Sequence, residues 1–380
     1  MEKYKIGIIG YGGFGKFLDH WWSKLDNIEV IAVADSGQHY HKIKNYRVYH
    51  DWKELIEDQK IDIVSIVTPP SLHAEMACAA MLAGKHVLLE KPVAICREDA
   101  RRILEVQKQT GKRITVNHMI RYNPIIRELM QIGESGSLGQ LHHAVVNNYA
   151  QDESLAENHW FWDEQISGGI MVEHGVHFFD IINALGRQHY QKVNGASQSR
   201  NDKQRDRVSA LVAYDKGLTA SYYHAFSGPG FFERTTISLV YDLARVEIEG
   251  WMPMKGKLEA LTESKNAEAF KRIPGWKETK KEFIAKAGDD SRPEGWGEGS
   301  ESASEENRVV AGGIAYKADQ IIHGTFEITQ SKGEVYGKCV QEILLDLILN
   351  IEDQNHKLAV TIEDAVEALE IALLASDKSV

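Results

Sequence analysis

The sequence predicts an α/β protein in which a parallel sheet built from βαβ units precedes a second α/β domain with a largely antiparallel sheet. Three observations lead to this prediction. The chain has 380 residues, more than one hydrophobic core usually supports. Up to about residue 121, short apolar runs alternate with helical stretches. Beyond that point, the apolar runs follow one another through turn signals. We therefore expect two domains, at residues 1–121 and 122–380.

The first domain alternates between two periods. Its strand candidates are short and rich in β-branched residues, as in a parallel sheet covered on both faces. The stretches between them are helical in character and suit right-handed crossovers. The expected strands are Ile6–Ile9, Val30–Ala34, Ile63–Val67, His86–Leu89 and Ile114–Asn117. The expected helices are Phe14–Leu25, Trp52–Asp58, Leu72–Ala83 and Arg97–Thr110.

In the second domain the strand candidates pair through turns. Asp215-Lys216-Gly217 joins Val208–Tyr214 to Leu218–Phe226, and two further runs follow at Thr235–Tyr241 and Arg245–Glu249. This pattern predicts an antiparallel sheet with one face available to cover another element.

The last quarter of the chain predicts a loop and two helices. Residues 288–307 contain Trp296 as their only large apolar side chain, so we expect a mobile loop or lid there. A helix is expected at Val335–Asn350. A second one should begin after Thr361, which has Asp364 three residues on, as in a capping box. The C-terminal helix can pack back on the first domain.

Composition restricts the class of protein. The formal net charge of −11 argues against nucleic acid or an anionic membrane surface as the main partner. Three cysteines without CxxC spacing, Cys78, Cys96 and Cys339, suggest reduced thiols. The N-terminus runs at once into a strand, and no apolar stretch approaches the ~20 residues of a spanning helix. We therefore expect a cytoplasmic protein.

A glycine-rich turn follows the first strand. In Gly10-Tyr11-Gly12-Gly13-Phe14-Gly15 the glycines fall in the GxGxxG pattern. Gly10 permits a tight turn, Gly12 lets the backbone approach a pyrophosphate, and Gly15 lets the helix lie close to the strand. The helix N-terminus then offers free N–H groups to phosphates. Alone, such a turn often only connects two elements.

The position of Asp35 makes this turn more specific. Asp35 ends the second strand twenty residues after Gly15, where a carboxylate can accept hydrogen bonds from the adenosine ribose hydroxyls. It would repel a 2′-phosphate, and no arginine follows closely, so we expect NAD rather than NADP. The alternative is an aspartate that only caps a helix.

Two later strand ends should also face the cofactor, because ligands bind at the carboxyl ends of the strands in such sheets. They carry Thr68-Pro69-Pro70-Ser71-Leu72-His73 and Glu90-Lys91-Pro92. His73 alternatively packs beside the helix that it begins. The cofactor contacts predicted so far are Gly10, Tyr11, Gly12, Gly13, Phe14, Gly15, Asp35, Ser36, Thr68, Pro69, Pro70, His73, Glu90 and Lys91.

The segment Gly168–Leu185 predicts a buried helix, because it is apolar nearly all round. Glu173, His177 and Asp180 lie at i, i+4 and i+7, on one face. Buried polar groups cost roughly 1–3 kcal/mol each unless they are paired. We therefore expect Glu173 to orient the His177 imidazole and to stabilise its protonated form, as a general base requires.

Two alternatives remain for this helix. A histidine there can be a hydrogen-bonded core residue without a chemical role. Glu173, His174 and His177 could also hold a metal, but the two histidines lack HExxH spacing and hydride transfer needs no metal, so we expect none.

Lys91 is the second candidate for chemistry. A lysine at the end of a strand would place an ammonium beside the nicotinamide, where it can hydrogen-bond a substrate hydroxyl and stabilise a developing alkoxide. The alternative is an ordinary surface lysine.

These stretches resemble the glucose–fructose oxidoreductase / inositol dehydrogenase (Gfo/Idh/MocA) family over the whole chain. The motifs that carry the resemblance are GYGGFG, TPPSLHAEMACAAMLAGKHVLLEKP, NHMIRYNP and SGGIMVEHGVHFFD. The resemblance implies a Rossmann dinucleotide-binding domain, then an α/β domain with an open-faced sheet through which dimers or tetramers form.

The resemblance also implies roles for single residues. Lys91 matches the lysine of the family's EKP motif, and His177 matches the histidine of its D-x-G-x-H motif. Asn117, Arg121 and Tyr122 fall in the segment that lines the cofactor–substrate junction, so Asn117 joins the cofactor contacts. Glu173 stands where the family usually has Asp, which puts the substrate geometry in doubt. The acidic loop at 288–307 is a second departure.

Aromatic side chains offer a platform for a sugar. Trp160-Phe161-Trp162-Asp163 precedes the predicted catalytic helix, and either Trp160 or Trp162, but not both, should stack on the substrate; core packing is the alternative. The predicted substrate contacts are Arg121, Tyr122, Trp160, Trp162, His174 and His177.

The sequence thus predicts an NAD-dependent dehydrogenase acting on a secondary hydroxyl of a sugar, sugar derivative or cyclitol. A redox-neutral NAD-dependent glycosidase, which oxidises a hydroxyl transiently, eliminates the aglycone, adds water and returns the hydride, would carry the same motifs. A redox-sensing binding protein is a third possibility, although a sensor has no need of both Lys91 and His177.

Overall fold

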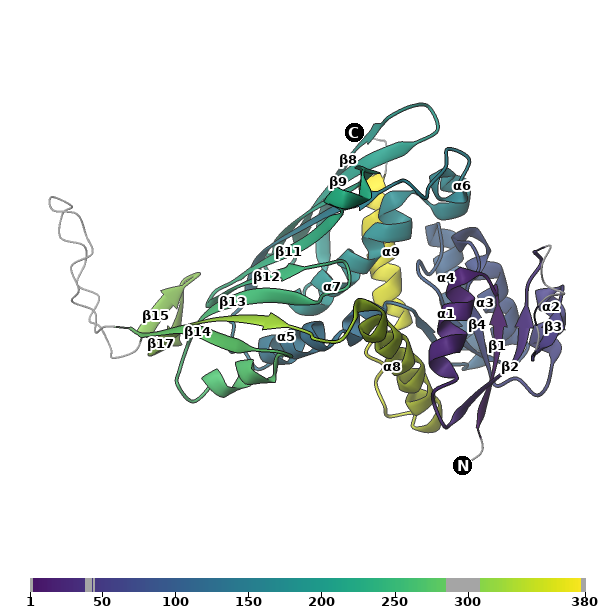
Figure 1. Cartoon of the computed structure of the whole chain (residues 1–380), viewed down its shortest axis with the longest axis horizontal. Helices are drawn as coiled ribbons and strands as arrows, with labels where there is room; N and C mark the ends of the chain where they lie inside the picture. Colours follow the sequence, from purple (N-terminus) through teal and green to yellow (C-terminus); the bar gives the residue numbers. More distant parts are fainter. Residues whose placement is uncertain (1–2, 38–42, 44, 285–307, 377–380) are drawn as a thin grey trace.

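The computed structural model describes residues 3–37, 43, 45–284 and 308–376. Its first sheet has six parallel strands in the order β3-β2-β1-β4-β5-β6, so two βαβ series run outward from β1 (Figure 1). The strands are β1 (Tyr4–Ile9), β2 (Ile28–Ala34), β3 (Arg47–Tyr49), β4 (Ile63–Ile66), β5 (His86–Leu89) and β6 (Ile114–Val116). The helices between them are α1 (Gly13–Trp22), α2 (Trp52–Glu57), α3 (His73–Leu82) and α4 (Arg97–Thr110).

The predicted parallel sheet is therefore confirmed. Sequence analysis missed only β3, which has three residues and no apolar run of its own. The strands β4 and β5 are buried almost throughout, as expected of central strands covered by helices on both faces.

The second sheet has nine strands in the order β14-β17-β13-β12-β11-β7-β10-β9-β8. All neighbours are antiparallel except β7 and β10, which run parallel, so the largely antiparallel sheet is confirmed. Its strands are β7 (Leu141–Gln151), β8 (Tyr190–Ser199), β9 (Arg205–Tyr214), β10 (Thr219–Gly228), β11 (Arg234–Tyr241), β12 (Ala244–Glu249), β13 (Lys255–Thr262), β14 (Lys277–Phe283) and β17 (Gln320–Glu327); β15 (Arg308–Ala311) and β16 (Ile314–Lys317) form a separate hairpin.

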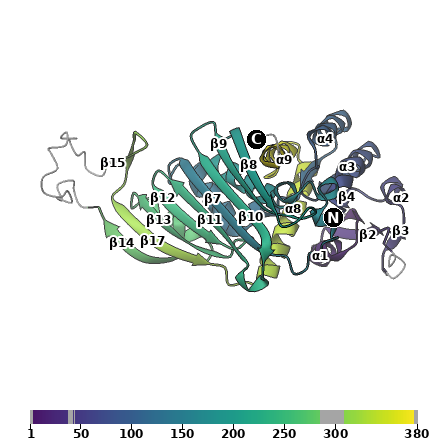
Figure 2. The same ribbon diagram turned by 90° about the horizontal axis from the view of Figure 1, so that it is seen from above.

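Buried residues alternate with exposed ones along β12 and mainly with half-buried ones along β9, so one face of this sheet is covered and the other is more open. Helices α7 and α9 pack on the covered face, and α9 is seen beside β8 in Figure 2. The helices of this half are α5 (Pro124–Glu134), α6 (Glu164–Ser167), α7 (Val176–Gly186), α8 (Lys332–Glu352) and α9 (Ile362–Ser376). The short turns are η2 (Pro70–Leu72), η3 (Met119–Tyr122), η4 (Trp160–Trp162), η5 (Met171–Gly175), η6 (Gly230–Phe232) and η7 (Ala267–Arg272).

The two C-terminal helices lie between the sheets in both views (Figures 1 and 2). Helix α8 packs against α1, where the Trp22 indole donates to the Val340 carbonyl at 2.8 Å. Helix α9 begins with the expected cap, because Thr361 Oγ1 accepts from the Asp364 N–H. Since both helices return to the first sheet, the domain division at residue 121 stays a proposal.

Two expectations need comment. The predicted helix at 168–185 is interrupted, because η5 is a π-helical turn that precedes α7. The predicted loop at 288–307 with Trp296 lies outside the described residues.

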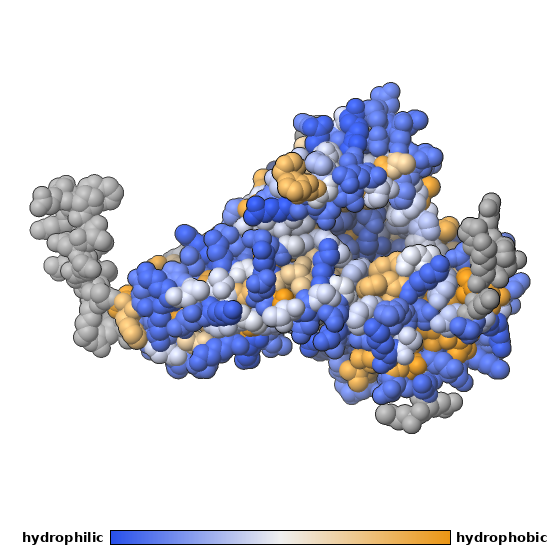
Figure 3. Space-filling model, in the orientation of Figure 1, coloured by the Kyte–Doolittle hydropathy of each residue, from blue (hydrophilic) through white to orange (hydrophobic). Residues whose placement is uncertain are grey.

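Within the part of the chain that the structure describes, no helix has both the length and the apolar character that crossing a membrane requires. The surface in Figure 3 is mostly hydrophilic, with apolar side chains in separate patches.

Candidate active site

A pocket of about 490 Å³ lies between the first sheet and the covered face of the second sheet. The first domain contributes residues at the carboxyl ends of β4 and β5, where parallel sheets bind their ligands. The second half contributes η5, α7, α8 and the ends of β7 and β10. Of the predicted site residues, the pocket is lined by Phe14, Thr68, Pro70, Glu90, Lys91, Trp160, Glu173, His174 and His177.

Lys91 and Glu173 form an ion pair inside this pocket. The Lys91 ammonium donates to the Glu173 carboxylate and also to the Glu173 backbone carbonyl at 2.7 Å. Both side chains are largely buried, with 16% and 15% of their surface exposed. Lys91 is therefore no ordinary surface lysine, and two acceptors on η5 fix its position.

The expected pairing of Glu173 with His177 is wrong. The Glu173 carboxylate is held by Lys91, and the Nδ1 atom of His177 is buried without a hydrogen-bond partner. Burial, followed by the charge of Lys91, holds the pKa of His177 well below its usual value. His177 is thus kept neutral rather than protonated, because the Glu173 carboxylate is bound to Lys91 and does not stabilise an imidazolium.

Asp180, the third residue of the predicted face, pairs elsewhere. Its two carboxylate oxygens accept from Arg121 Nε and Nη2, both at 2.7 Å. Arg121 also donates to the Ala359 carbonyl at 2.8 Å and lies 3.2 Å from the Asp364 carboxylate. These charges from η3, α7 and α9 neutralise one another, which explains how Asp180 can be completely buried.

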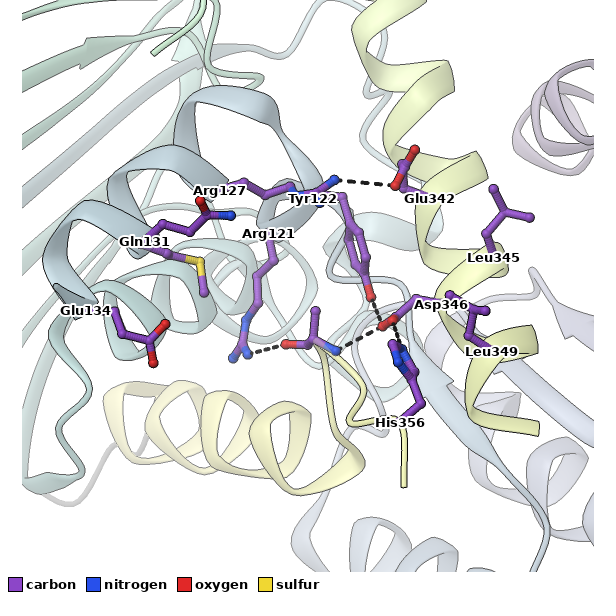
Figure 4. A pocket seen from close by; sticks show the side chains of 12 residues that line it. Arg121, Tyr122, Arg127, Gln131, Glu134, Glu342, Leu345, Asp346, Leu349 and His356 are labelled. Atoms are coloured by element: carbon purple, nitrogen blue, oxygen red, sulfur yellow. Dashed lines mark hydrogen bonds and ion pairs between the residues drawn. The ribbon is translucent and has the colours of Figure 1, made fainter. Parts of the chain in front are cut away.

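Arg121 and Tyr122 were expected to bind substrate, and the structure places them outside the active-site pocket. They line a second pocket of about 350 Å³ beside α5 and α8 (Figure 4). Here the Tyr122 hydroxyl donates to Asp346 at 2.6 Å, and His356 lies 2.6 Å from the other oxygen of the same carboxylate. Both residues thus bond groups on or beside α8 and α9, and their predicted contact with the substrate stays a prediction.

The glycine-rich turn has the geometry that a dinucleotide requires. Gly10 has a φ of +92°, and a Cβ atom there would lie 2.6 Å from the Val67 carbonyl oxygen. A Cβ atom at Gly15 would lie 2.2 Å from the Gly10 carbonyl oxygen. A Cβ atom added at Gly12 or Gly13, by contrast, would have no neighbouring atom within 4 Å. The turn is therefore tight on its inner side and open on the side where a pyrophosphate would approach.

Asp35 is tied to this turn. Its carboxylate accepts from the Tyr11 N–H at 2.9 Å and from the Gly37 N–H at 2.7 Å. It caps no helix, since both donors belong to turns. Each oxygen keeps a lone pair, so the residue still fits the ribose hydroxyls. Ser36 follows it and is exposed.

The strand ends after β4 and β5 are joined by His73. This side chain is fully buried, with Nδ1 2.7 Å from the Pro92 carbonyl oxygen and Nε2 2.9 Å from that of Thr68. Burial lowers its pKa to about 4. His73 thus joins the two loops and does not line the pocket, and its predicted contact with the cofactor stays a prediction. Pro69 is exposed beside the pocket.

Glu90 and Asn117 form a buried pair beside Lys91. The Asn117 amide donates to the Glu90 carboxylate. Burial raises the pKa of Glu90 to about 7, against the opposing effects of Asn117 and Lys91. A carboxyl group whose proton is held this tightly can donate as well as accept within the pocket.

The two tryptophans differ in position. Trp160 lines the pocket and is 37% exposed, whereas Trp162 is 8% exposed, does not line it, and its indole donates to the Leu155 carbonyl. Trp162 is therefore a packing residue, and only Trp160 remains a candidate platform.

Sequence reasoning missed several residues at this site. Trp251 lines the pocket from the turn between β12 and β13, and Tyr336 lines it from α8. His118 and His224 are buried beside His177 and His174, and none of their ring nitrogens has a hydrogen-bond partner. His118 lies in the NHMIRYNP motif and was passed over there, whereas no quoted motif contains Trp251, Tyr336 or His224. Among the described residues, no three His, Cys, Asp or Glu side chains gather closely enough to hold a metal.

Comparison with known proteins places this geometry in a family. The family described as "Oxidoreductase family, NAD-binding Rossmann fold" matches residues 4–118, and the GFO/IDH/MocA C-terminal domain matches residues 126–240. Inositol 2-dehydrogenase of Salmonella paratyphi B is 33% identical over 144 residues, which is 36% of this chain and 43% of that protein. Myo-inositol 2-dehydrogenase of Thermotoga maritima is 25% identical over 194 residues, 50% of this chain and 57% of that protein. The chain thus spans about half the length of these curated relatives.

Solved structures share the whole fold. Scyllo-inositol dehydrogenase from Lactobacillus casei, solved with NAD(H) and scyllo-inositol, superimposes with a TM-score of 0.68 at 17% identity, over 98% of this chain and 96% of that one. Myo-inositol 2-dehydrogenase from Lactobacillus plantarum gives a TM-score of 0.69 at 18% identity, over 98% and 96%. Since the two domain matches together cover more than half of the chain in the expected order, the protein belongs to the GFO/IDH/MocA oxidoreductase family and carries its NAD-binding Rossmann domain.

Proposed function

We propose that the protein is an NAD-dependent dehydrogenase that transfers a hydride between the nicotinamide and a secondary hydroxyl of a sugar, sugar derivative or cyclitol. One observation carries the proposal: a fixed ammonium and a neutral imidazole line the same pocket at the carboxyl edge of the NAD-binding sheet.

His177 is the proposed base. Its Nδ1 atom is buried, so Nε2 is the nitrogen that can take the hydroxyl proton from a substrate in the pocket. A neutral imidazole accepts this proton without prior deprotonation. When bound, NAD supplies the acceptor for the hydride.

Lys91 stabilises the substrate oxygen as it loses its proton. Two of its three N–H donors are engaged by Glu173, which leaves the third for the substrate. Glu173 is therefore a positioning residue for Lys91. The longer reach of Glu compared with the family's Asp serves this ion pair.

The proposed substrate is polyhydroxylated. His174 lines the pocket beside His177, and burial lowers its pKa to about 3, so it is a neutral group that can bond a second hydroxyl. Trp160 offers its ring to the C–H face of a sugar. The similar proteins named above act on inositols, which are polyols of this kind.

The test combines purified protein and NAD with free sugars, inositols and chromogenic glycosides, and follows NADH and released aglycone together. We expect NADH to accumulate with a free sugar or cyclitol. Aglycone release that needs NAD but accumulates no NADH would instead identify the redox-neutral glycosidase, which the similar proteins do not favour. No reaction on any alcohol would contradict the proposal.

We also propose that copies of the chain associate through the open face of the second sheet. Tyr149 and Leu211 stand there 48% and 46% exposed. Light scattering should give a dimer or tetramer, and Leu211→Glu should lower that mass.

A further inference from the structure

We propose that His118 is a positioning residue for the base His177, in the place that the sequence assigned to Glu173. The proposal rests on the proposed function, since it concerns the base of that reaction. His118 lies within the NHMIRYNP motif but was given no role there, and it does not line the active-site pocket.

The His177 ring is held by other rings. His118 packs against it on one side, with ring centroids 6.1 Å apart and planes at 88°. His174 packs on another side at 6.1 Å and 80°. His224 packs on His174 with ring centroids 5.4 Å apart, so His118, His177, His174 and His224 form a row of rings. Perpendicular rings at these distances make the edge-to-face contacts that aromatic pairs prefer.

His118 is suited to fix its neighbour because its own position is rigid. It is 1% exposed and follows directly after Asn117, which is bonded to Glu90. Its backbone N–H donates to the Val116 carbonyl at 2.6 Å, and its carbonyl accepts from the Arg121 N–H at 3.1 Å. The ring therefore stands on backbone that is bonded on both sides.

The concentration of unpartnered nitrogens marks the row as more than packing. Six buried ring nitrogens of these four histidines have no hydrogen-bond partner: both nitrogens of His118 and His224, and Nδ1 of His174 and His177. Each unmet group costs roughly 1–3 kcal/mol, so a merely structural core would use Phe or Leu at these positions.

The surroundings of this row also disfavour a positive charge on the His177 imidazole. The titratable groups that face His177 are Lys91 from the β5 end, Glu173 and His174 from η5, His118 from the β6 end and His224 from β10. The carboxylate among them is bound to Lys91, so no free anion balances an imidazolium. His118 itself faces Asp180, Arg121 and Asp364, which are paired with one another, and Lys91.

The test titrates His177 directly, by NMR of protein labelled with ¹³C-histidine and saturated with NAD. The His177 signal is identified by its loss in His177→Asn. We expect its midpoint to lie well below that of a free imidazole, as burial and its neighbours dictate. In His118→Asn, which is smaller and leaves room for water beside the His177 ring, the midpoint should move to higher pH, whereas His118→Phe, which keeps an edge-to-face ring there, should leave it low. His86→Asn is the control, because burial also lowers the pKa of His86, to about 4, at the far end of β5.

The pH profile of kcat/KM provides the second readout. In His118→Asn it should fall about 10-fold more at pH 6 than at pH 8.5, because His177 is then protonated at the lower pH, and in His118→Phe the fall should not depend on pH. An unchanged His177 titration in His118→Asn, with an equal loss at every pH, would overturn the inference and leave His118 a packing residue. If no alcohol is oxidised by the wild type, the proposed function fails, and the NMR titration still decides the role of His118.

Discussion

The turn η5 and the helix α7 carry two polar clusters that are stabilised in opposite ways. Around Asp180, every charge has an opposite partner, and Arg121 uses its donors on two carboxylates and a carbonyl. Around His177, three residues earlier, buried nitrogens are left without partners. Each cluster is centred on a buried residue of α7, His177 in one and Asp180 in the other.

The difference separates structure from function. A buried polar group in a native protein normally finds its partner, and groups that do not are concentrated where a ligand completes the bonding. The Asp180 cluster is complete and therefore serves the docking of α9. The His177 cluster is incomplete toward a pocket, so it should affect turnover far more than stability. The predictions below test this division.

The largest effect should come from His177→Asn. Removing a general base lowers kcat by about 10²–10⁴-fold. The midpoint of urea unfolding should stay the same or rise, because a buried unpartnered nitrogen is lost, and NAD should still bind. Initial rates, fluorescence titration of NAD and urea unfolding check these three points. Unaltered turnover would reject His177 as the base.

Arg121→Met should have the opposite effect, lowering stability far more than turnover. It leaves the completely buried Asp180 carboxylate without its partner, and breaking a buried pair in this way costs about 3–5 kcal/mol. Urea unfolding should therefore show a large loss of stability, while kcat per folded molecule changes little. A double variant, Arg121→Met with Asp180→Leu, should recover part of the stability. If Arg121→Met instead lowers kcat without loss of stability, the division between the clusters is wrong.

Glu90 should make stability depend on pH. Burial raises its pKa to about 7 from 4.5. The folded protein therefore binds the proton more tightly than the unfolded chain does. This contribution is complete below pH 4.5 and is lost as the pH rises through 7. Over that window the wild type should lose about 3 kcal/mol relative to Glu90→Gln. Urea unfolding of both proteins at pH 5, 6, 7 and 8 measures the difference, and a difference that is constant with pH would contradict the burial.

The fold was largely predictable because its signals are local. The turn at Gly10–Gly15 and the strands around it are encoded within forty residues, and Lys91 follows its strand directly. The partners of the polar groups were not predictable in the same way. Glu173 bonds a lysine 82 residues away, and Arg121 bonds Asp364, 243 residues away. Helical spacing alone placed Glu173 beside His177, because it takes no account of a cation arriving from another element.

Glu173→Gln tests the ion pair that replaced this prediction. Gln keeps the size of the side chain but loses the charge that holds Lys91. Misplacement of a reacting group by about 1 Å can cost about 10²-fold in rate, so we expect a loss of that order in kcat with NAD binding intact. Glu173→Asp should retain more activity than Gln, because it keeps the charge. If Gln and the wild type are equally active, Glu173 does not position Lys91.

The smallest effect should separate the two tryptophans. Trp160 touches the pocket and is 37% exposed, so Trp160→Ala should raise the KM for sugars about 3–10-fold, the equivalent of about 0.5–1.5 kcal/mol of ring contact, and leave unfolding nearly unchanged. Trp162 is buried against Phe161, so Trp162→Ala should mainly lower stability, by about 3–5 kcal/mol. Steady-state kinetics and urea unfolding of both variants decide the matter. Equal effects on KM would mean that the platform extends to Trp162 or that neither ring stacks on the substrate. The distinction between Trp160 as a site residue and Trp162 as a packing residue would then be wrong.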